Sequence, residues 1–477
     1  MDPLVLLAVG LASVLGGILL LRLHPFIALI LAALLVSALT PESGIRRFAE
    51  SKKMSDKETE TIVKQTIGKR VATALGGTAT KVGILIALAA IIGQCMLESG
   101  AADRIVRGFI SGFGEARAGL AFALAGFLLG IPVYFDTVFF LMIPLAKSLA
   151  LRTGKNYCLY ILAVIAGGSI SHSLVPPTPG PLLVAGELGV SMGDMIIAGF
   201  LIGGVASTAG YLYARWFNRT FDLPVREAAP GQLDELRALA DKDVKELPGL
   251  VSALAPIVLP VLFVTFQTVL GSPFGKEISG DWPKTLLEIF RTLGDPVVAL
   301  AIAAAFAMTL LAQQKRGGSR DVMESIPGAL KDAGVIILIT SAGGAFGGIL
   351  QQTGIGPRLQ EVTGGMTIGL LPLAWFITAV VRVAQGSATV AMITAVGIVG
   401  GVATPETLGF SPVYLAVAIG CGSKMLPWFN DSGFWVVCKM SGFTERETLK
   451  SFTPLLSIMG FTGLLATMVL AKLWPQL

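Results

Sequence analysis

The sequence predicts an all-α polytopic membrane protein with two inverted repeats, each holding a re-entrant helical hairpin and an interrupted transmembrane helix. Of its 477 residues, 53% are hydrophobic and only 14% are charged, whereas a soluble domain carries about a quarter charged residues. The mean hydropathy is +0.75. This composition argues against a soluble globule, a disordered chain and a nucleic-acid binder. The net charge of +5 is more typical of basic cytoplasmic loops between membrane spans.

Ten apolar stretches are candidate transmembrane helices, because a bilayer core of about 30 Å needs about 20 apolar residues per helix. The first stretch follows an acidic residue and no basic region, so we expect a retained span and not a cleaved signal peptide. Two of the stretches contain a polar or proline-rich interruption. The ten lie near 4–21, 25–40, 78–97, 157–185 (interrupted), 193–215, 249–271, 293–312, 333–352, 411–438 (interrupted) and 453–474.

Two further apolar stretches, 118–150 and 366–400, predict re-entrant hairpins. The first breaks at LGIPVYFDT and the second at RVAQGSAT. Each is too long for one helix, and its two arms are shorter than the roughly 20 residues that a full span needs. We therefore expect two half-helices that enter and leave the membrane on the same side.

A polar segment at 217–248 predicts a linker between two membrane repeats, 1–216 and 249–477. The segment 41–77 is also polar and predicts a second long aqueous connection.

The break motifs of the first repeat recur in the second. ESGAADRI at 98–105 aligns with QTGIGPRL at 352–359, an offset of 254 residues, and the same offset places Pro132 on Gly386. Each repeat then holds five full crossings, and this odd number requires the second repeat to be inverted in the membrane. Inverted repeats with discontinuous helices are the architecture of secondary transporters.

Asp136 is an ionisable residue at membrane depth, where such residues are functional candidates by default. It lies in the apolar hairpin sequence GIPVYFDTVFF, with no basic residue within ten positions. A carboxyl group in that setting is a candidate proton or cation coupling site. The alternative is a cap for the returning half-helix, where an aspartate is also favoured.

His172 lies in SISHSLVPPTPGP, directly before prolines that cannot continue a helix. Histidine titrates near physiological pH, so we expect a proton relay or a hydrogen bond to substrate, with a packing histidine as the alternative. Ser171 and Thr178 are expected to be polar lining or capping groups.

The second hairpin tip predicts an anion site. In RVAQGSATVAMIT, Ser387 and Thr389 open a half-helix, whose free N–H groups and positive dipole end favour an anion. A plain packing turn of small residues is the alternative. Arg382 could pair with substrate or extend its side chain to the membrane interface.

A polar cluster interrupts the apolar stretch GSKMLPWFNDSGFW. Asn430, Asp431 and Ser432 are consecutive there, and an amide, a carboxylate and a hydroxyl together suit polyhydroxy or ionic ligands. Lys424 could instead neutralise Asp431 and make that pair structural.

Several chemistries are disfavoured by what the sequence lacks. It contains no G-x-x-x-x-G-K-[ST] motif for ATP binding. Four isolated cysteines and two histidines predict neither a metal site nor a disulfide, so we expect no cofactor. Ser171 adjoins His172, but adjacent helical residues point in different directions, which disfavours an intramembrane serine hydrolase. We therefore do not expect an enzyme.

The motifs HSLVPPTPGP, GSATVAMIT and NDSGFW, in this order and spacing, resemble those of the gluconate permease family. That family comprises bacterial sugar-acid:proton symporters of the ion transporter superfamily. The resemblance covers essentially the whole chain, and Asp136 falls where relatives have an acid, commonly Glu. It implies a multi-pass bacterial inner-membrane importer, and in the wider superfamily a homodimer with elevator-like movement of the hairpins and interrupted helices.

The chain also departs from the family pattern. Thr178 replaces a frequent histidine of the proline motif, Pro427, Trp428 and Phe429 replace a polar run, and Lys424 is an added cation. These departures put gluconate itself in question while keeping the anionic substrate class.

We thus expect a secondary active transporter that imports gluconate or a related small hydroxy-carboxylate by proton symport. In this hypothesis Ser387 and Thr389 bind the carboxylate, Asn430 and Asp431 bind hydroxyl groups, and Asp136 or His172 carries the proton. Its partners would be the substrate, protons and the lipid bilayer, with no nucleic acid. The alternatives are a sodium-coupled carboxylate or D-serine carrier and, less favoured, an intramembrane hydrolase.

Overall fold

The computed structural model is helical throughout the part of the chain that it describes, which confirms the predicted all-α fold. It describes residues 2–52, 54–221, 223, 225–226, 246–271, 282–315, 318–355, 358, 369–400, 408–429 and 431–476. Within these ranges, seven helical stretches are long and apolar enough to cross a membrane, or up to nine if each of two bent pairs counts as one span.

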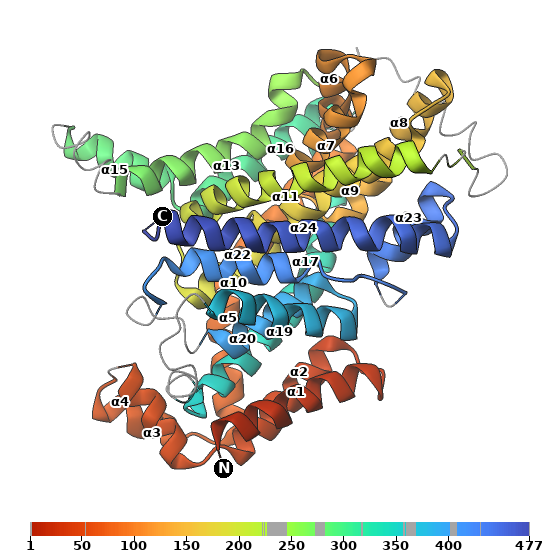
Figure 1. The fold of residues 1–477 in the computed structure, drawn as a ribbon. Helices are drawn as coiled ribbons and strands as arrows, with labels where there is room; N and C mark the ends of the chain where they lie inside the picture. Colours follow the sequence, from red (N-terminus) through yellow and green to blue (C-terminus); the bar gives the residue numbers. More distant parts are fainter. Residues whose placement is uncertain are drawn as a thin grey trace.

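The N-terminal part consists of two apolar helices and two short polar ones. Helices α1 (Pro3–Leu19) and α2 (Pro25–Leu39) each begin at a proline, whose fixed φ suits the first helical position. Helices α3 (Glu42–Ser51) and α4 (Asp56–Val63) follow, and all four lie together at one end of the molecule (Figure 1).

The segment 41–77, predicted as a long aqueous connection, is therefore largely helical. Its local signals explain this difference. Ser55 and Glu58 form a capping box at the start of α4, and such a box satisfies two free N–H groups of the first turn. Arg46 joins the two helices by contacting Glu42 at 2.6 Å and Glu60 at 2.8 Å, and its hydrogen bond lowers the pKa of Glu60.

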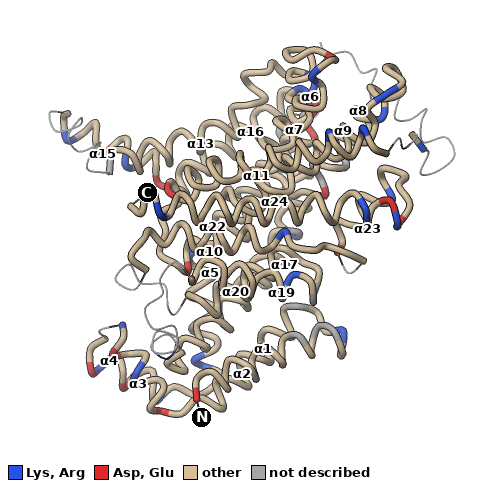
Figure 2. Tube along the Cα trace, viewed as in Figure 1, with Lys and Arg blue, Asp and Glu red and all other residues tan. Residues whose placement is uncertain are grey.

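The long helices of the two halves are α5 (Ile67–Glu98), α11 (Met192–Thr220), α13 (Leu250–Gly271), α16 (Pro296–Gln314), α17 (Ser319–Gln352) and α24 (Glu445–Leu473). Figure 1 shows α11, α24 and α22 (Pro412–Gly422) running side by side through the centre. In Figure 2, lysine, arginine, aspartate and glutamate gather near the ends of the molecule and are sparse along the middle of the long helices, as a bilayer requires.

Two short amphipathic helices were not predicted. Helix α6 (Ala101–Phe113) precedes the 3₁₀ turn η1 (Glu115–Arg117), and the chain bends by 110° between α6 and the following helix. Helix α15 (Lys284–Leu293) lies at the opposite end of the molecule (Figure 1). Neither contains an apolar run of transmembrane length, so a search of the sequence for membrane spans does not find them.

The chain breaks at all four places that the sequence singled out. The first hairpin consists of α7 (Ala118–Leu129) and α8 (Phe135–Thr153), and the second of α19 (Leu370–Gln385) and α20 (Ala388–Val399). The interrupted helices are α9 (Tyr157–Leu174) with α10 (Pro179–Leu188), and α22 with α23 (Ser432–Ser441). Gly386 makes the second hairpin turn at φ +84°, which favours glycine because it has no Cβ.

Helices of the first half recur in the second at a nearly constant offset. Helix α8 begins at Phe135 and α20 at Ala388, 253 residues later, and α11 and α24 begin at Met192 and Glu445, again 253 residues apart. This spacing supports a repeat, while the inverted orientation of its two halves stays a prediction.

The first hairpin is held by an unusually close approach of α7 and α9. A Cβ on Gly167 of α9 would lie 1.9 Å from the carbonyl oxygen of Ala123, and one on Gly126 of α7 would lie 2.9 Å from the carbonyl oxygen of Val164. Small residues at such crossings let membrane helices pack backbone to backbone.

We expect Gly167→Ala to lower the stability of the protein by about 1–3 kcal/mol, the usual effect of overpacking. Gly76→Ala is the matched control, because Gly76 lies in α5 with no atom within 4 Å of its Cβ position. That control should be neutral or stabilising by up to about 1 kcal/mol, since alanine favours helices. Thermal unfolding in detergent measures both, and an unchanged midpoint for Gly167→Ala would contradict the close packing.

Candidate substrate-binding site

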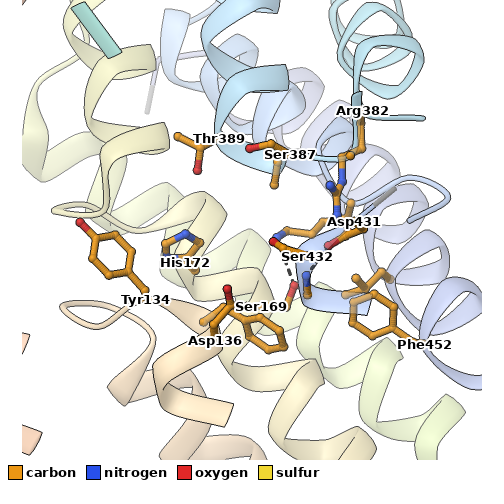
Figure 3. A pocket seen from close by; sticks show the side chains of 16 residues that line it. Tyr134, Asp136, Ser169, His172, Arg382, Ser387, Thr389, Asp431, Ser432 and Phe452 are labelled. Atoms are coloured by element: carbon orange, nitrogen blue, oxygen red, sulfur yellow. Dashed lines mark hydrogen bonds and ion pairs between the residues drawn. The ribbon is translucent and has the colours of Figure 1, made fainter. Parts of the chain in front are cut away.

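One cavity of about 210 Å³ lies where the two hairpin tips meet the two interrupted helices. Figure 3 shows side chains from all four elements pointing into it. Its polar lining brings together seven of the nine residues that the sequence singled out for the site: Asp136, His172, Arg382, Ser387, Thr389, Asp431 and Ser432.

Three helices begin at the cavity wall. Their N-cap residues are Tyr134 for α8, Ser387 for α20 and Asp431 for α23, and all three line the cavity. The N-terminus of a helix carries a partial positive charge and free N–H groups. Each of these three N-termini therefore offers a position that favours a negatively charged group of a ligand.

A buried ion pair connects the second hairpin to the second interrupted helix. A terminal guanidinium nitrogen of Arg382 contacts a carboxylate oxygen of Asp431, and each side chain is only 5% exposed. The other carboxylate oxygen accepts hydrogen bonds from the N–H groups of Gly433 at 2.6 Å and Phe434 at 3.3 Å. Asp431 thus caps α23 and neutralises Arg382 at the same time.

One expectation was that Arg382 extends its side chain to the membrane interface, and the structure does not show this. Arg382 points toward the cavity (Figure 3), and its Nε and second terminal nitrogen are buried without a hydrogen-bond partner in the described part of the chain. A buried guanidinium with unused donors can still bind an acceptor on a ligand.

Lys424 is a second buried cation in the cavity wall, with 4% of its surface exposed. Its ammonium donates a hydrogen bond to the hydroxyl of Ser169 at 3.1 Å. It does not neutralise Asp431, the alternative left open from the sequence, because Arg382 occupies that role.

Asp136 and His172 face the cavity from the first half of the chain. Asp136 lies in the first turn of α8, which has no side-chain cap, so the helix-cap alternative is not what the structure shows. His172 lies near the end of α9, and its Nδ1 is buried with no partner among the described residues. The rings of Tyr134 and His172 meet edge to face with centroids 6.0 Å apart.

One expected site residue lies away from the cavity, and a second is not described by the structure. Thr178 is buried at the break between α9 and α10, where its hydroxyl lies within hydrogen-bond distance of the carbonyl oxygens of His172 at 2.8 Å and Val175 at 2.9 Å. It therefore satisfies freed backbone acceptors. Asn430 lies outside the residues that the structure describes.

The cavity also contains residues that sequence reasoning missed. Ser169 precedes His172 by three positions on α9, and residues at this spacing share a helix face, so the signal was available. Phe452 and Leu456 of α24 close one side of the cavity. Nothing distinguishes these two from the other apolar residues of their helix.

A sequence profile of GntP family permeases matches residues 2–473. The chain belongs to the GntP permease family. A gluconate permease of Pseudomonas aeruginosa is 32% identical over 473 residues, covering 98% of this chain and 97% of the relative. The low-affinity gluconate transporter of Escherichia coli is 33% identical over 404 residues, covering 84% and 87%.

A further relative, the inner membrane permease YgbN of Escherichia coli, is 32% identical over 480 residues and covers 98% of each chain. This GntP permease is accordingly a multi-pass protein of the inner membrane. The crystal structure of the YdaH transporter of Alcanivorax borkumensis matches its fold with a TM-score of 0.60 at 16% identity, over 84% of this chain and 88% of the other.

We expect Asp431→Asn to destabilise this permease by about 3–5 kcal/mol, because it leaves Arg382 buried without a counter-charge. Asparagine also caps helices, so the variant keeps the cap of α23. The loss of stability therefore measures the ion pair. The double variant Arg382→Gln with Asp431→Asn should recover most of the stability. Thermal unfolding in detergent measures the cycle.

Arg46→Gln is the control for that cycle, since Arg46 forms exposed ion pairs, and its midpoint should not change measurably. If the double variant were as unstable as Asp431→Asn, the destabilisation would come from some other contact of Asp431.

Proposed function

We propose that this GntP permease imports gluconate, or a small hydroxy-carboxylate close to it, by proton symport through the cavity at the hairpin tips. The observation that carries the proposal is the lining of that cavity: two buried cations, three helix N-termini and the hydroxyls of Ser387, Thr389 and Ser432. Relatives that match nearly its whole length are named gluconate permeases, which supports the substrate class.

The charges of the cavity suggest where the carboxylate binds. Arg382 and Asp431 neutralise each other, which leaves the ammonium of Lys424 as a cation without a carboxylate partner in the described chain. A substrate carboxylate near Lys424 and the N-terminus of α20 would receive both its charge and the hydroxyls of Ser387 and Thr389. The remaining hydroxyl groups of a sugar acid would face Ser432 and Asp431.

The same charges give a physical reason for coupling to one proton. With Lys424 charged and Asp136 ionised, the empty cavity is neutral. Substrate alone makes it −1, a proton on Asp136 alone makes it +1, and the two together restore neutrality. Because a net charge at membrane depth is unfavourable, the empty and the doubly loaded states are favoured. This mutual stabilisation of proton and substrate is the coupling that symport requires.

His172 is the second candidate for the coupling proton. It lines the same cavity, and a histidine can hold a proton near physiological pH. A neutral His172 does not change the net charge of the cavity. Its ring nitrogen that has no partner in the described chain serves as a hydrogen-bond partner for substrate.

We expect uptake of labelled gluconate into proteoliposomes to be concentrative under an inward proton gradient and to be abolished by an uncoupler. Asp136→Asn should lose net accumulation by about ten-fold or more, since the empty cavity then carries a charge that costs at least about 1.4 kcal/mol. The same variant should retain exchange of internal for external gluconate, because its loaded cavity is neutral.

His172→Gln is the parallel variant, and it should keep gradient-driven accumulation. Unchanged accumulation by Asp136→Asn would refute its role in coupling. Accumulation that disappears when choline replaces sodium, or that occurs with D-serine but not gluconate, would refute the proposed proton coupling or substrate.

A further inference from the structure

We propose that a groove on the outer face of this protein, between α7 and α11, binds one anionic phospholipid. The groove has a basic mouth and an apolar shaft. The mouth is a cavity of about 440 Å³ lined by Arg117, Arg215 and Arg219. The shaft is a cavity of about 380 Å³ with an almost entirely apolar lining. Leu120 and Tyr211 line both cavities, so the two cavities adjoin.

The mouth is built to bind an anion. Arg215 and Arg219 lie one turn apart at the end of α11 and so share a face, and Arg117 of η1 lies across from them. None of the three forms an ion pair with a described residue, and no aspartate or glutamate of the described chain lines the mouth. Guanidinium groups bind phosphate oxygens through paired hydrogen bonds.

The floor of the mouth is fixed by two asparagines. The amide of Asn218 donates to the side-chain oxygen of Asn156 at 3.1 Å, and its own oxygen accepts from the N–H of Leu159 at 3.0 Å. These contacts hold the end of α11 against the start of α9. The arginines therefore project from a rigid base.

The shaft suits an acyl chain. Phe127 and Phe200 close its deep end with ring centroids 5.6 Å apart. From Tyr211 at the mouth to Phe200 is 11 residues of α11, or about 16 Å, which is about half of the roughly 30 Å hydrocarbon core. A groove of this length spans one leaflet.

The position of the mouth along the helix matches the level of lipid headgroups. Trp216, which lies between the two arginines on α11, and Phe221, which follows the helix as its C-cap, are exposed, and aromatic residues of this kind concentrate at the membrane–water boundary. Exposed Leu201, Val205 and Leu212 continue the same helix toward the middle of the bilayer. Basic pockets between membrane helices are the known setting for anionic headgroups.

The test measures lipid binding to the full-length protein in detergent by native mass spectrometry. We expect the first phosphatidylglycerol to bind at least about 25-fold more tightly than phosphatidylcholine with the same acyl chains. Arg215→Gln with Arg219→Gln should weaken phosphatidylglycerol binding about 25-fold, at about five-fold per arginine, and leave phosphatidylcholine unaffected.

Two matched variants test separately the position of the positive charge and the role of the apolar shaft. Lys284→Gln with Arg291→Gln removes two exposed cations from α15 at the opposite end of the molecule, and should change binding by less than about two-fold. Gly204→Phe fills the shaft, where no atom lies within 4 Å of the Cβ position, and should weaken binding of both lipids. Ser207→Phe replaces it if that protein does not fold.

Several results would overturn the proposal. Equal affinity for the two lipids, or no effect of the arginine pair, would remove the headgroup site. Displacement of the lipid by glycerol 3-phosphate together with no effect of Gly204→Phe would indicate a site for soluble phosphates. Conversion of a dimer to a monomer by Gly204→Phe would assign the groove to a second copy of the chain.

Discussion

The ion pair between Arg382 and Asp431 is the contact on which the site depends. A helix that stops inside a bilayer leaves polar backbone groups that neither lipid nor water can satisfy. Asp431 satisfies those at the start of α23, and its charge is balanced by an arginine at the end of α19. One carboxylate therefore makes the second break stable and fixes the hairpin tip that carries Ser387 and Thr389 beside it.

In the described part of the first half, the backbone groups at the corresponding break are satisfied without a charged pair. There the hydroxyl of Thr178 satisfies carbonyls at the end of α9, and glycines bring α7 against α9. Neither the carboxyl group of Asp136 nor the Nδ1 atom of His172 is used to satisfy this break in the described chain, and both residues line the cavity. This division between a fixed, neutralised half and a half with a titratable acid underlies the proposed coupling of one proton to one carboxylate.

The helix breaks were predictable, because prolines, glycines and polar residues interrupt apolar stretches at points where a continuous membrane helix would need apolar ones. The pairing of side chains that are distant in the sequence was not predictable. Arg382 and Asp431 are 49 residues apart, and Lys424 and Ser169 are 255 apart, so only the folded chain shows that Asp431 pairs with the arginine and that Lys424 stays available. The helices of 41–77 were missed because span length was the criterion, although Ser55 and Glu58 carried a capping signal.

Protection of a cysteine inside the cavity measures most directly whether gluconate binds there. Ser432 is exposed within the cavity, and the native cysteines Cys95, Cys158, Cys421 and Cys438 are all buried, so Ser432→Cys should be the residue that a maleimide modifies. Gluconate at ten times its Kd should slow this modification about ten-fold and leave that of Ser111→Cys, on exposed α6, unchanged. Equal rates with and without bound gluconate would place the substrate elsewhere.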